Sequence, residues 1–219
     1  MYSWNNLESQ IIEEMLGKHP NLEPCTPGMA SFHGALVNTY NLDGCFFTCG
    51  NGGSYADAQH IVGELCKSFE RQRPLPGALR ENLSGLPCGK ELAQHLETGL
   101  PAVTLGLNGP LKTAIENDVP LANIAFAQEL NALMRSGDML LAISTSGNAA
   151  NCLMAISVAR AKKGVSAALT GPNGGPMAAH ADIAIKAPGT DTKQIQEAHV
   201  VIWHTLCCLI EAHYFPTKR

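Results

Sequence analysis

The chain has 219 residues, of which 45% are hydrophobic and 16% are charged, and its formal net charge at pH 7 is -4. This length is sufficient for one large domain with its own hydrophobic core. The negative charge argues against a nucleic-acid-binding protein, because such proteins usually carry a basic patch. No apolar run approaches the roughly 18–20 residues of a membrane span. The N-terminus lacks a basic segment followed by an apolar one, so we expect a cytoplasmic protein.

Residues 1–42 predict two helices, over 3–18 and 31–41, each with an apolar stripe along one side. Prolines at positions 20 and 24 separate them. We expect these N-terminal helices to pack on the domain that follows, residues 43–219, or on a neighbouring subunit.

The rest of the chain alternates between short apolar runs and amphipathic segments. The apolar runs predict five strands, at 45–49, 102–107, 139–143, 165–169 and 182–187. The clearest helical patterns cover 54–69, 121–135 and 192–214. Because the strands are continuously apolar and alternate with helices, we expect a doubly wound α/β fold with a five-stranded parallel sheet.

An insert at about 70–101 interrupts this alternation. It is rich in proline and glycine, and only 91–97 has a helical pattern. We therefore expect a long loop with one short helix, a length that usually indicates a functional or mobile segment.

Two glycine-bearing turns follow predicted strands, at 50–54 (Gly-Asn-Gly-Gly-Ser) and 144–148 (Ser-Thr-Ser-Gly-Asn). In parallel α/β sheets, ligands bind beyond the C-terminal ends of the strands. Glycine permits close approach of the backbone, and free N–H groups at a helix start bind phosphate. Either turn alone could be structural, but the two together predict a sugar-phosphate site. Neither has the spacing of a P-loop or of a dinucleotide-binding turn.

His60 and Glu64 follow the first turn and are four residues apart, so they share one helix face. Behind an anion site, this pair suggests an enzyme acting on a phosphorylated substrate. For Glu64 alone, a solvated helix face is the ordinary interpretation. His204 lies in an apolar helix, where a lone histidine is more often a hydrogen-bonded core residue.

The two turns and the surrounding strand order resemble the sugar isomerase (SIS) domain, and within that group the sequence is similar to the phosphoheptose isomerase family. The similarity runs from about residue 45 to the C-terminus, interrupted by the insert. The matching segments are 50–54, 57–60 with Glu64, 73–74, 117–118, 137–138, 143–148, 169–171, 174–175, and 195–197 with His204.

The resemblance implies an aldose–ketose isomerase that converts sedoheptulose 7-phosphate to D-glycero-D-manno-heptose 7-phosphate through a cis-enediol. It implies Glu64 as the base and His204 as the acid, residue types suited to such proton transfers. It also implies a homotetramer with sites at subunit interfaces. The implied substrate contacts are Asn51, Gly52, Gly53, Ser54, Asn117, Asp118, Ser144, Thr145, Ser146 and Gln196. The implied zinc ligands are His60, Glu64, Gln196 and His204, and bound zinc would act as a Lewis acid.

The sequence departs from the family pattern at two positions. Ala149 stands where family members usually carry a serine, and Ser68 stands where a basic residue is common. Two alternatives therefore stay open: a non-catalytic SIS protein that binds a sugar phosphate or a protein partner, as the replication-initiator-associating relatives do, or an isomerase of another sugar phosphate. The presence of both Glu64 and His204 favours catalysis.

Overall fold

A computed structural model describes residues 2–217. Its centre is a five-stranded sheet in which all neighbouring strands are parallel, in the order β2-β1-β3-β4-β5. The strands are β1 (Phe46–Gly50), β2 (Ala102–Thr104), β3 (Met139–Ser144), β4 (Val165–Thr170) and β5 (Ile183–Lys186). The predicted five-stranded parallel sheet is confirmed. The second strand is shorter than predicted, since the chain turns at Gly106 with φ +90°.

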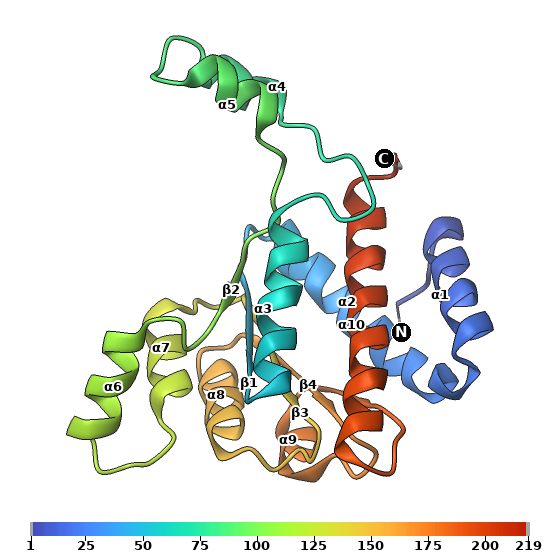
Figure 1. The fold of residues 1–219 in the computed structure, drawn as a ribbon, viewed down its shortest axis with the longest axis vertical. Helices are drawn as coiled ribbons and strands as arrows, with labels where there is room; N and C mark the ends of the chain where they lie inside the picture. The colour runs from blue at the N-terminus through green and yellow to red at the C-terminus, as the bar shows by residue number, and fades with distance from the viewer. Residues whose placement is uncertain (1, 218–219) are drawn as a thin grey trace.

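Helices cover both faces of the sheet, as expected for a doubly wound fold (Figure 1). Phe46 and Leu141 contribute to the core on one face, which is covered by α2 (Thr26–Asn41), α3 (Gly53–Cys66) and α10 (Thr192–Tyr214). Phe47 and Leu140 contribute to the core on the other face, because successive strand residues point in opposite directions. That face is covered by α7 (Ala125–Leu133), α8 (Ala150–Ala161) and α9 (Gly175–His180).

The N-terminal region forms α1 (Asn6–Lys18), the 3-10 helix η1 (Pro20–Cys25) and α2. Asn5 caps α1, and its own backbone N–H donates to the Glu8 carboxylate, so a reciprocal capping box fixes the helix start. Helix α1 packs against α10, so the first and last helices of the chain lie side by side (Figure 1). Within residues 2–217, no helix is both long and apolar enough to cross a membrane.

The insert is more ordered than the sequence predicts. It contains two helices, α4 (Gly77–Leu83) and α5 (Gly89–His95), which project from the body as an arm (Figure 1). The prediction of an irregular segment over 77–83 was wrong. The proline and glycine lie at the boundaries of α4, with Pro76 before its first turn and Gly85, at φ +83°, beyond its end. In these positions the two residues delimit a helix.

Candidate active site

The two glycine-bearing turns lie side by side at one edge of the sheet. Gly50, the last residue of β1, is in register with Ile143 of β3, so both strands deliver their turns to the same edge. The side-chain amides of Asn51 and Asn151 exchange two hydrogen bonds, of 2.9 and 2.8 Å. This exchange joins the first turn to the start of α8, and the expectation that both turns share one edge is confirmed.

Glycine is required in these turns for steric reasons. Gly52 precedes α3 with φ +55°, a conformation that L side chains rarely adopt. A Cβ at Gly50 would lie 2.5 Å from the backbone oxygen of Ser54. In the second turn, Gly147 has φ +68° and packs against the backbone of Gly174. The backbone of both turns is therefore close-packed and held in one conformation.

The hydroxyl groups of the second turn differ in exposure. Ser144 is buried, Thr145 is half-buried and Ser146 is exposed. The Ser146 hydroxyl accepts a hydrogen bond of 3.2 Å from the backbone N–H of Asn148. The turn thus presents hydroxyls and N–H groups immediately before α8, which is the arrangement that favours an anion.

Glu64 lies one helical turn after His60 on α3, and its side chain is only 10% exposed. Its Oε1 atom is 3.0 Å from Nε2 of His60, and its Oε2 atom accepts a hydrogen bond of 2.8 Å from Nζ of Lys67. Burial acts to raise the pKa of Glu64, but Lys67 and His60 outweigh it, so this pKa lies below its usual value. Glu64 is therefore a buried, ionised carboxylate and not part of a solvated helix face.

His204 reaches the same place from α10. Its ring lies edge-to-face with that of His60, with centroids 5.3 Å apart, and stacks on Phe69 at 5.8 Å. Burial and the neighbouring His60 lower the pKa of His204, and the Val200 backbone and Glu64 offset only part of this effect. The imidazole is therefore neutral at pH 7. It also borders a cavity of about 360 Å³ between α1 and α10.

The remaining predicted residues fall into two groups. Gln196 lies at the first turn, where its side-chain amide occupies the space that a Cβ at Gly53 would need. Asn117 and Asp118 are the exposed last residues of α6 (Gly109–Asp118), joined by a side-chain hydrogen bond of 3.0 Å. Figure 1 shows α6 beyond α7, away from α10. A single chain thus places Gln196 at the first turn and groups His60, Glu64 and His204 farther along α3 and α10, while α6, which carries Asn117 and Asp118, lies apart.

The four predicted zinc ligands fit the ion in their chemistry but only in part in their placement. Nitrogen and oxygen donors suit zinc, and the 3.0 Å between His60 and Glu64 is close to the separation of two ligands of one ion. Among residues 2–217, however, His60, Glu64 and His204 do not form a group whose donor atoms all lie within 4.8 Å, whereas Glu8, His33 and His213 do. The structure therefore groups His60, Glu64 and His204 without converging their donor atoms on one point, and it places Gln196 at the first turn.

The structure also identifies contacts that support the site and that the sequence did not indicate, although 73–74 is one of the segments that match the family. Arg73 donates hydrogen bonds to the carbonyl oxygens of Leu65 at 2.6 Å and Glu64 at 3.0 Å. These carbonyl groups lie in the last turn of α3, where they have no hydrogen-bond donor within the helix. Glu211 on α10 pairs with Arg73 at 2.8 Å. Lys67 could have been recognised from its spacing of three residues from Glu64. The Arg73–Glu211 pair joins distant parts of the chain and leaves no local pattern.

Comparison with known proteins agrees with this arrangement. Residues 115–207 match the family model of the SIS domain. Together with the parallel sheet and its two hydroxyl- and glycine-bearing turns, this match defines a SIS-domain protein. The chain is 40% identical over 193 residues to phosphoheptose isomerase from Rhodospirillum rubrum, covering 87% of this chain and 88% of the relative. It therefore belongs to the phosphoheptose isomerase family.

Two further relatives support this assignment. Phosphoheptose isomerase from Aneurinibacillus thermoaerophilus is 36% identical over 182 residues, covering 83% of this chain and 79% of the relative. The solved structure of a phosphoheptose isomerase from Francisella tularensis superposes with a TM-score of 0.72 at 29% identity, covering 96% of this chain and 98% of that chain.

Proposed function

We propose that this protein is an aldose–ketose isomerase that converts sedoheptulose 7-phosphate to D-glycero-D-manno-heptose 7-phosphate. The observation that carries the proposal is that Glu64 and His204 both lie against His60, from α3 and α10. A buried, ionised carboxylate lies beside a neutral imidazole, on the two helices that flank the glycine turn. The relatives named phosphoheptose isomerase support the choice of substrate.

In the proposed mechanism, the carboxylate of Glu64 removes a proton from C1 of the ketose, the carbon next to the carbonyl carbon C2, and returns it to C2 of the cis-enediol. The low pKa of Glu64 keeps it ionised and ready to accept that proton at neutral pH. His204, as a neutral imidazole, donates its N–H proton to O2 as the enediol forms and takes up the proton of O1 as the aldehyde forms, so its protonation state is restored. Each positioned acid or base of this kind contributes roughly 10²–10⁴-fold to the rate.

Binding of the phosphate is assigned to the second turn. Ser144, Thr145 and Ser146 would supply hydroxyls and N–H groups there, while Asn51, Gly52, Gly53, Ser54 and Gln196 would line the sugar chain. Ala149 removes one hydroxyl from the family pattern, which leaves the backbone and three hydroxyls to hold the phosphate. Asn117 and Asp118 lie away from these groups in one chain. We therefore infer that they act from a neighbouring subunit, in a cytoplasmic homotetramer with sites at subunit interfaces.

Zinc is a further part of the proposal. His60, Glu64, Gln196 and His204 would hold the ion, which would polarise the carbonyl and hydroxyl oxygens of the substrate. Gln196 and His204 must turn toward the His60–Glu64 pair for this, since the donor atoms do not converge. Full activity after removal of metal by a chelator would exclude a catalytic role for zinc.

The experiment is a direct assay. The purified protein is incubated with sedoheptulose 7-phosphate and aldose formation is followed for the wild type, Glu64→Gln and His204→Gln. Matched controls are Glu13→Gln and His180→Gln, which alter exposed residues on α1 and α9. We expect the site variants to lose roughly 10²–10⁴-fold in rate and the controls to retain it. An inactive wild type would refute this substrate, and unchanged site variants would refute the residue assignment.

The assay also separates the alternatives. Turnover of another ketose phosphate in place of sedoheptulose 7-phosphate would indicate an isomerase of different specificity. Binding of sugar phosphate without turnover of any would indicate a non-catalytic SIS protein. The presence of both Glu64 and His204 argues against a non-catalytic protein, and the relatives named phosphoheptose isomerase favour sedoheptulose 7-phosphate over other substrates.

A further inference from the structure

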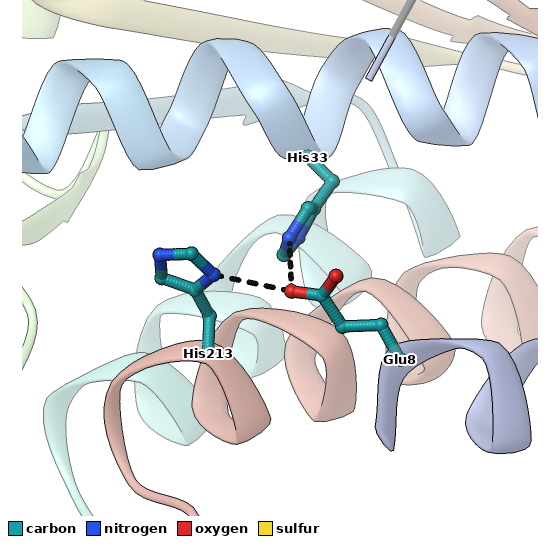
Figure 2. A group of neighbouring side chains, drawn as sticks. All are labelled: Glu8, His33 and His213. Atoms are coloured by element: carbon teal, nitrogen blue, oxygen red, sulfur yellow. Dashed lines mark hydrogen bonds and ion pairs between the residues drawn. The ribbon is translucent and has the colours of Figure 1, made fainter. Parts of the chain in front are cut away.

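A second group of donor atoms lies away from the candidate active site, at the junction of three helices. Glu8 comes from the first turn of α1, His33 from the middle of α2, and His213 from the last turn of α10. Oε1 of Glu8 is 3.0 Å from Nε2 of His33 and 3.1 Å from Nδ1 of His213. Figure 2 shows both rings pointing at the same carboxylate oxygen.

The environment of Glu8 is unusual for a carboxylate. The side chains of Glu8 and His33 are fully buried, and that of His213 is 28% exposed. Within residues 2–217, the ion pairs of Glu8 are with these two histidines and none is with a lysine or an arginine. Buried carboxylates are normally paired with a charge or bound to a metal.

His33 does not supply the missing positive charge. Burial lowers the pKa of His33 to about 4, although Glu8 opposes this effect. The ring is therefore neutral at pH 7, which is the form in which a histidine binds a metal. Burial would raise the pKa of Glu8, but hydrogen bonds from the Asn5 backbone and His213 and the contact with His33 hold it below its usual value. The pocket thus combines an ionised carboxylate with a neutral imidazole.

The distances match those between ligands of one ion. In a tetrahedral zinc site with bonds of about 2.0–2.2 Å, neighbouring ligand atoms are roughly 3.3–3.5 Å apart. The two Glu8–histidine distances are 3.0 and 3.1 Å, and the three donor atoms all lie within 4.8 Å of one another. Binding of an ion would lengthen the two Glu8–histidine distances by a few tenths of an ångström and bring the two histidine nitrogens to a similar separation, which would exchange the two hydrogen bonds for metal bonds.

We propose that Glu8, His33 and His213 bind a divalent transition-metal ion of the zinc class and thereby clamp α1 and α2 to the end of α10. Tyr2 would support the site without binding the ion. Its hydroxyl donates to both oxygens of Glu8, at 3.0 and 3.1 Å, and keeps its proton at neutral pH. Because the His213 side chain is 28% exposed, water would supply the fourth ligand.

The affinity of this site is limited by its surroundings. A metal at Nε2 of His33 places the ring proton on Nδ1, and that atom is buried without a hydrogen-bond partner. A ligating histidine normally donates this second N–H to an acceptor, and loss of such a partner typically weakens binding about 10–100-fold. We therefore expect a site that exchanges its metal with chelators.

The test measures zinc directly and does not use enzymatic activity. The full chain is stripped with a chelator, incubated with zinc chloride, desalted and analysed for zinc per chain by mass spectrometry. The main variant is His213→Gln, because that ring is partly exposed and its loss leaves the core intact. The matched control is His95→Gln, on the exposed surface of α5. We expect the wild type and the control to bind one more zinc ion per chain than His213→Gln.

Thermal unfolding gives an independent readout, because an ion that binds only the folded state raises the melting temperature of the protein. Zinc should raise the melting temperature of His213→Gln less than that of the wild type, and cobalt should give a ligand-field spectrum that this variant lacks. A His204→Gln variant separates this site from the proposed catalytic one. Loss of all zinc in His204→Gln, or equal zinc in the wild type and His213→Gln, would overturn the proposal and leave a hydrogen-bond network only.

Discussion

The Nζ atom of Lys67 lies 2.8 Å from Oε2 of Glu64, while the other carboxylate oxygen lies 3.0 Å from His60. Lys67 is the residue directly after the last turn of α3, so the fold presents its ammonium group to the carboxylate. Burial alone would raise the pKa of Glu64, and Lys67 is the largest of the influences that reverse this. Lys67 therefore lowers the pKa of the proposed base, together with His60.

Replacement of Lys67 tests this dependence. In Lys67→Met the positive charge is lost, so the pKa of Glu64 rises and its carboxylate is protonated at a higher pH. We expect the acidic limb of the kcat/KM profile to move to higher pH, with little change in rate above neutrality. The control Lys90→Met removes an exposed charge on α5 and should leave the profile in place. An acidic limb that does not move in Lys67→Met would contradict the role of Lys67.

Gly53 tests the assignment of Gln196. A methyl group at position 53 would overlap the amide of Gln196, which is the end of a flexible side chain and can turn away. We expect Gly53→Ala to fold with little loss of stability but to lose roughly 10–100-fold in kcat/KM, because a substrate contact is displaced. Steady-state kinetics and a thermal melt on the same sample separate the two effects.

Gly63 provides the control on the same helix. A Cβ there would meet no atom within 4 Å, and alanine in a helix interior is more stable than glycine by about 0.5–1 kcal/mol. Gly63→Ala should therefore be slightly stabilised and fully active. If Gly53→Ala had the kinetics of the wild type, Gln196 would not be a substrate contact at this position.

The sequence predicted best the elements whose signals are local. The strand at Met139–Ser144 is apolar up to its last residue, Ser144, because both of its faces are buried. The bounds of α10 were predicted correctly because Asp191 caps its start and Pro216 follows its end. Helix α4 was missed because its leucines have no buried face in the chain, with Leu79 44% exposed, so its amphipathic pattern is weak.

The candidate site was predictable to a similar extent. The two turns and the His60–Glu64 spacing are local patterns, and both lie where the sequence placed them. The association of His204 with α3 results from packing of α3 on α10, so only the family resemblance indicated it. The Glu8, His33 and His213 group joins three distant segments, and no spacing in the sequence reveals it.

Arg73 and Glu211 are expected to matter for stability. Their side chains are fully buried, and the Glu211 carboxylate also accepts backbone N–H groups from Phe69 and Glu70 at 2.8 and 2.7 Å. Removal of Arg73 would leave a charge buried without its partner, which typically costs about 3–5 kcal/mol. We expect Arg73→Met to lower the free energy of unfolding by about this amount in urea denaturation.

An exposed ion pair serves for comparison. Arg160 and Asp182 are 3.4 Å apart, with side chains 53% and 42% exposed. Such pairs contribute about 0–1 kcal/mol, so Arg160→Met should be close to the wild type in the same urea titration. If Arg73→Met and Arg160→Met lowered the free energy of unfolding by the same amount, the buried pair would contribute no more to stability than the exposed one.

His199 should make the protein sensitive to acid. The residue is fully buried in α10, and neither ring nitrogen has a partner at hydrogen-bonding geometry. Burial lowers the pKa of His199 to about 4 in the folded protein, and the nearby Thr170 backbone offsets only part of this lowering. In the unfolded chain the pKa of a histidine is about 6.5. Because the pKa in the folded state is the lower one, acid favours the unfolded state. The contribution of neutral His199 to the free energy of unfolding is complete above about pH 6.5. It falls by up to roughly 3 kcal/mol as the pH decreases toward about 4.

The slope of the free energy of unfolding against pH, compared between the wild type and His199→Leu, separates the effect of His199 from that of other acid-sensitive groups. In His199→Leu the side chain cannot take up a proton, so the free energy of unfolding should fall less steeply with pH than in the wild type. Urea titrations at several pH values between about 7 and 4 measure both slopes, whatever the stability of the variant at neutral pH. His180→Gln, exposed on α9, should keep the slope of the wild type. Identical slopes in the wild type and His199→Leu would mean that His199 does not remain neutral in the folded protein at low pH.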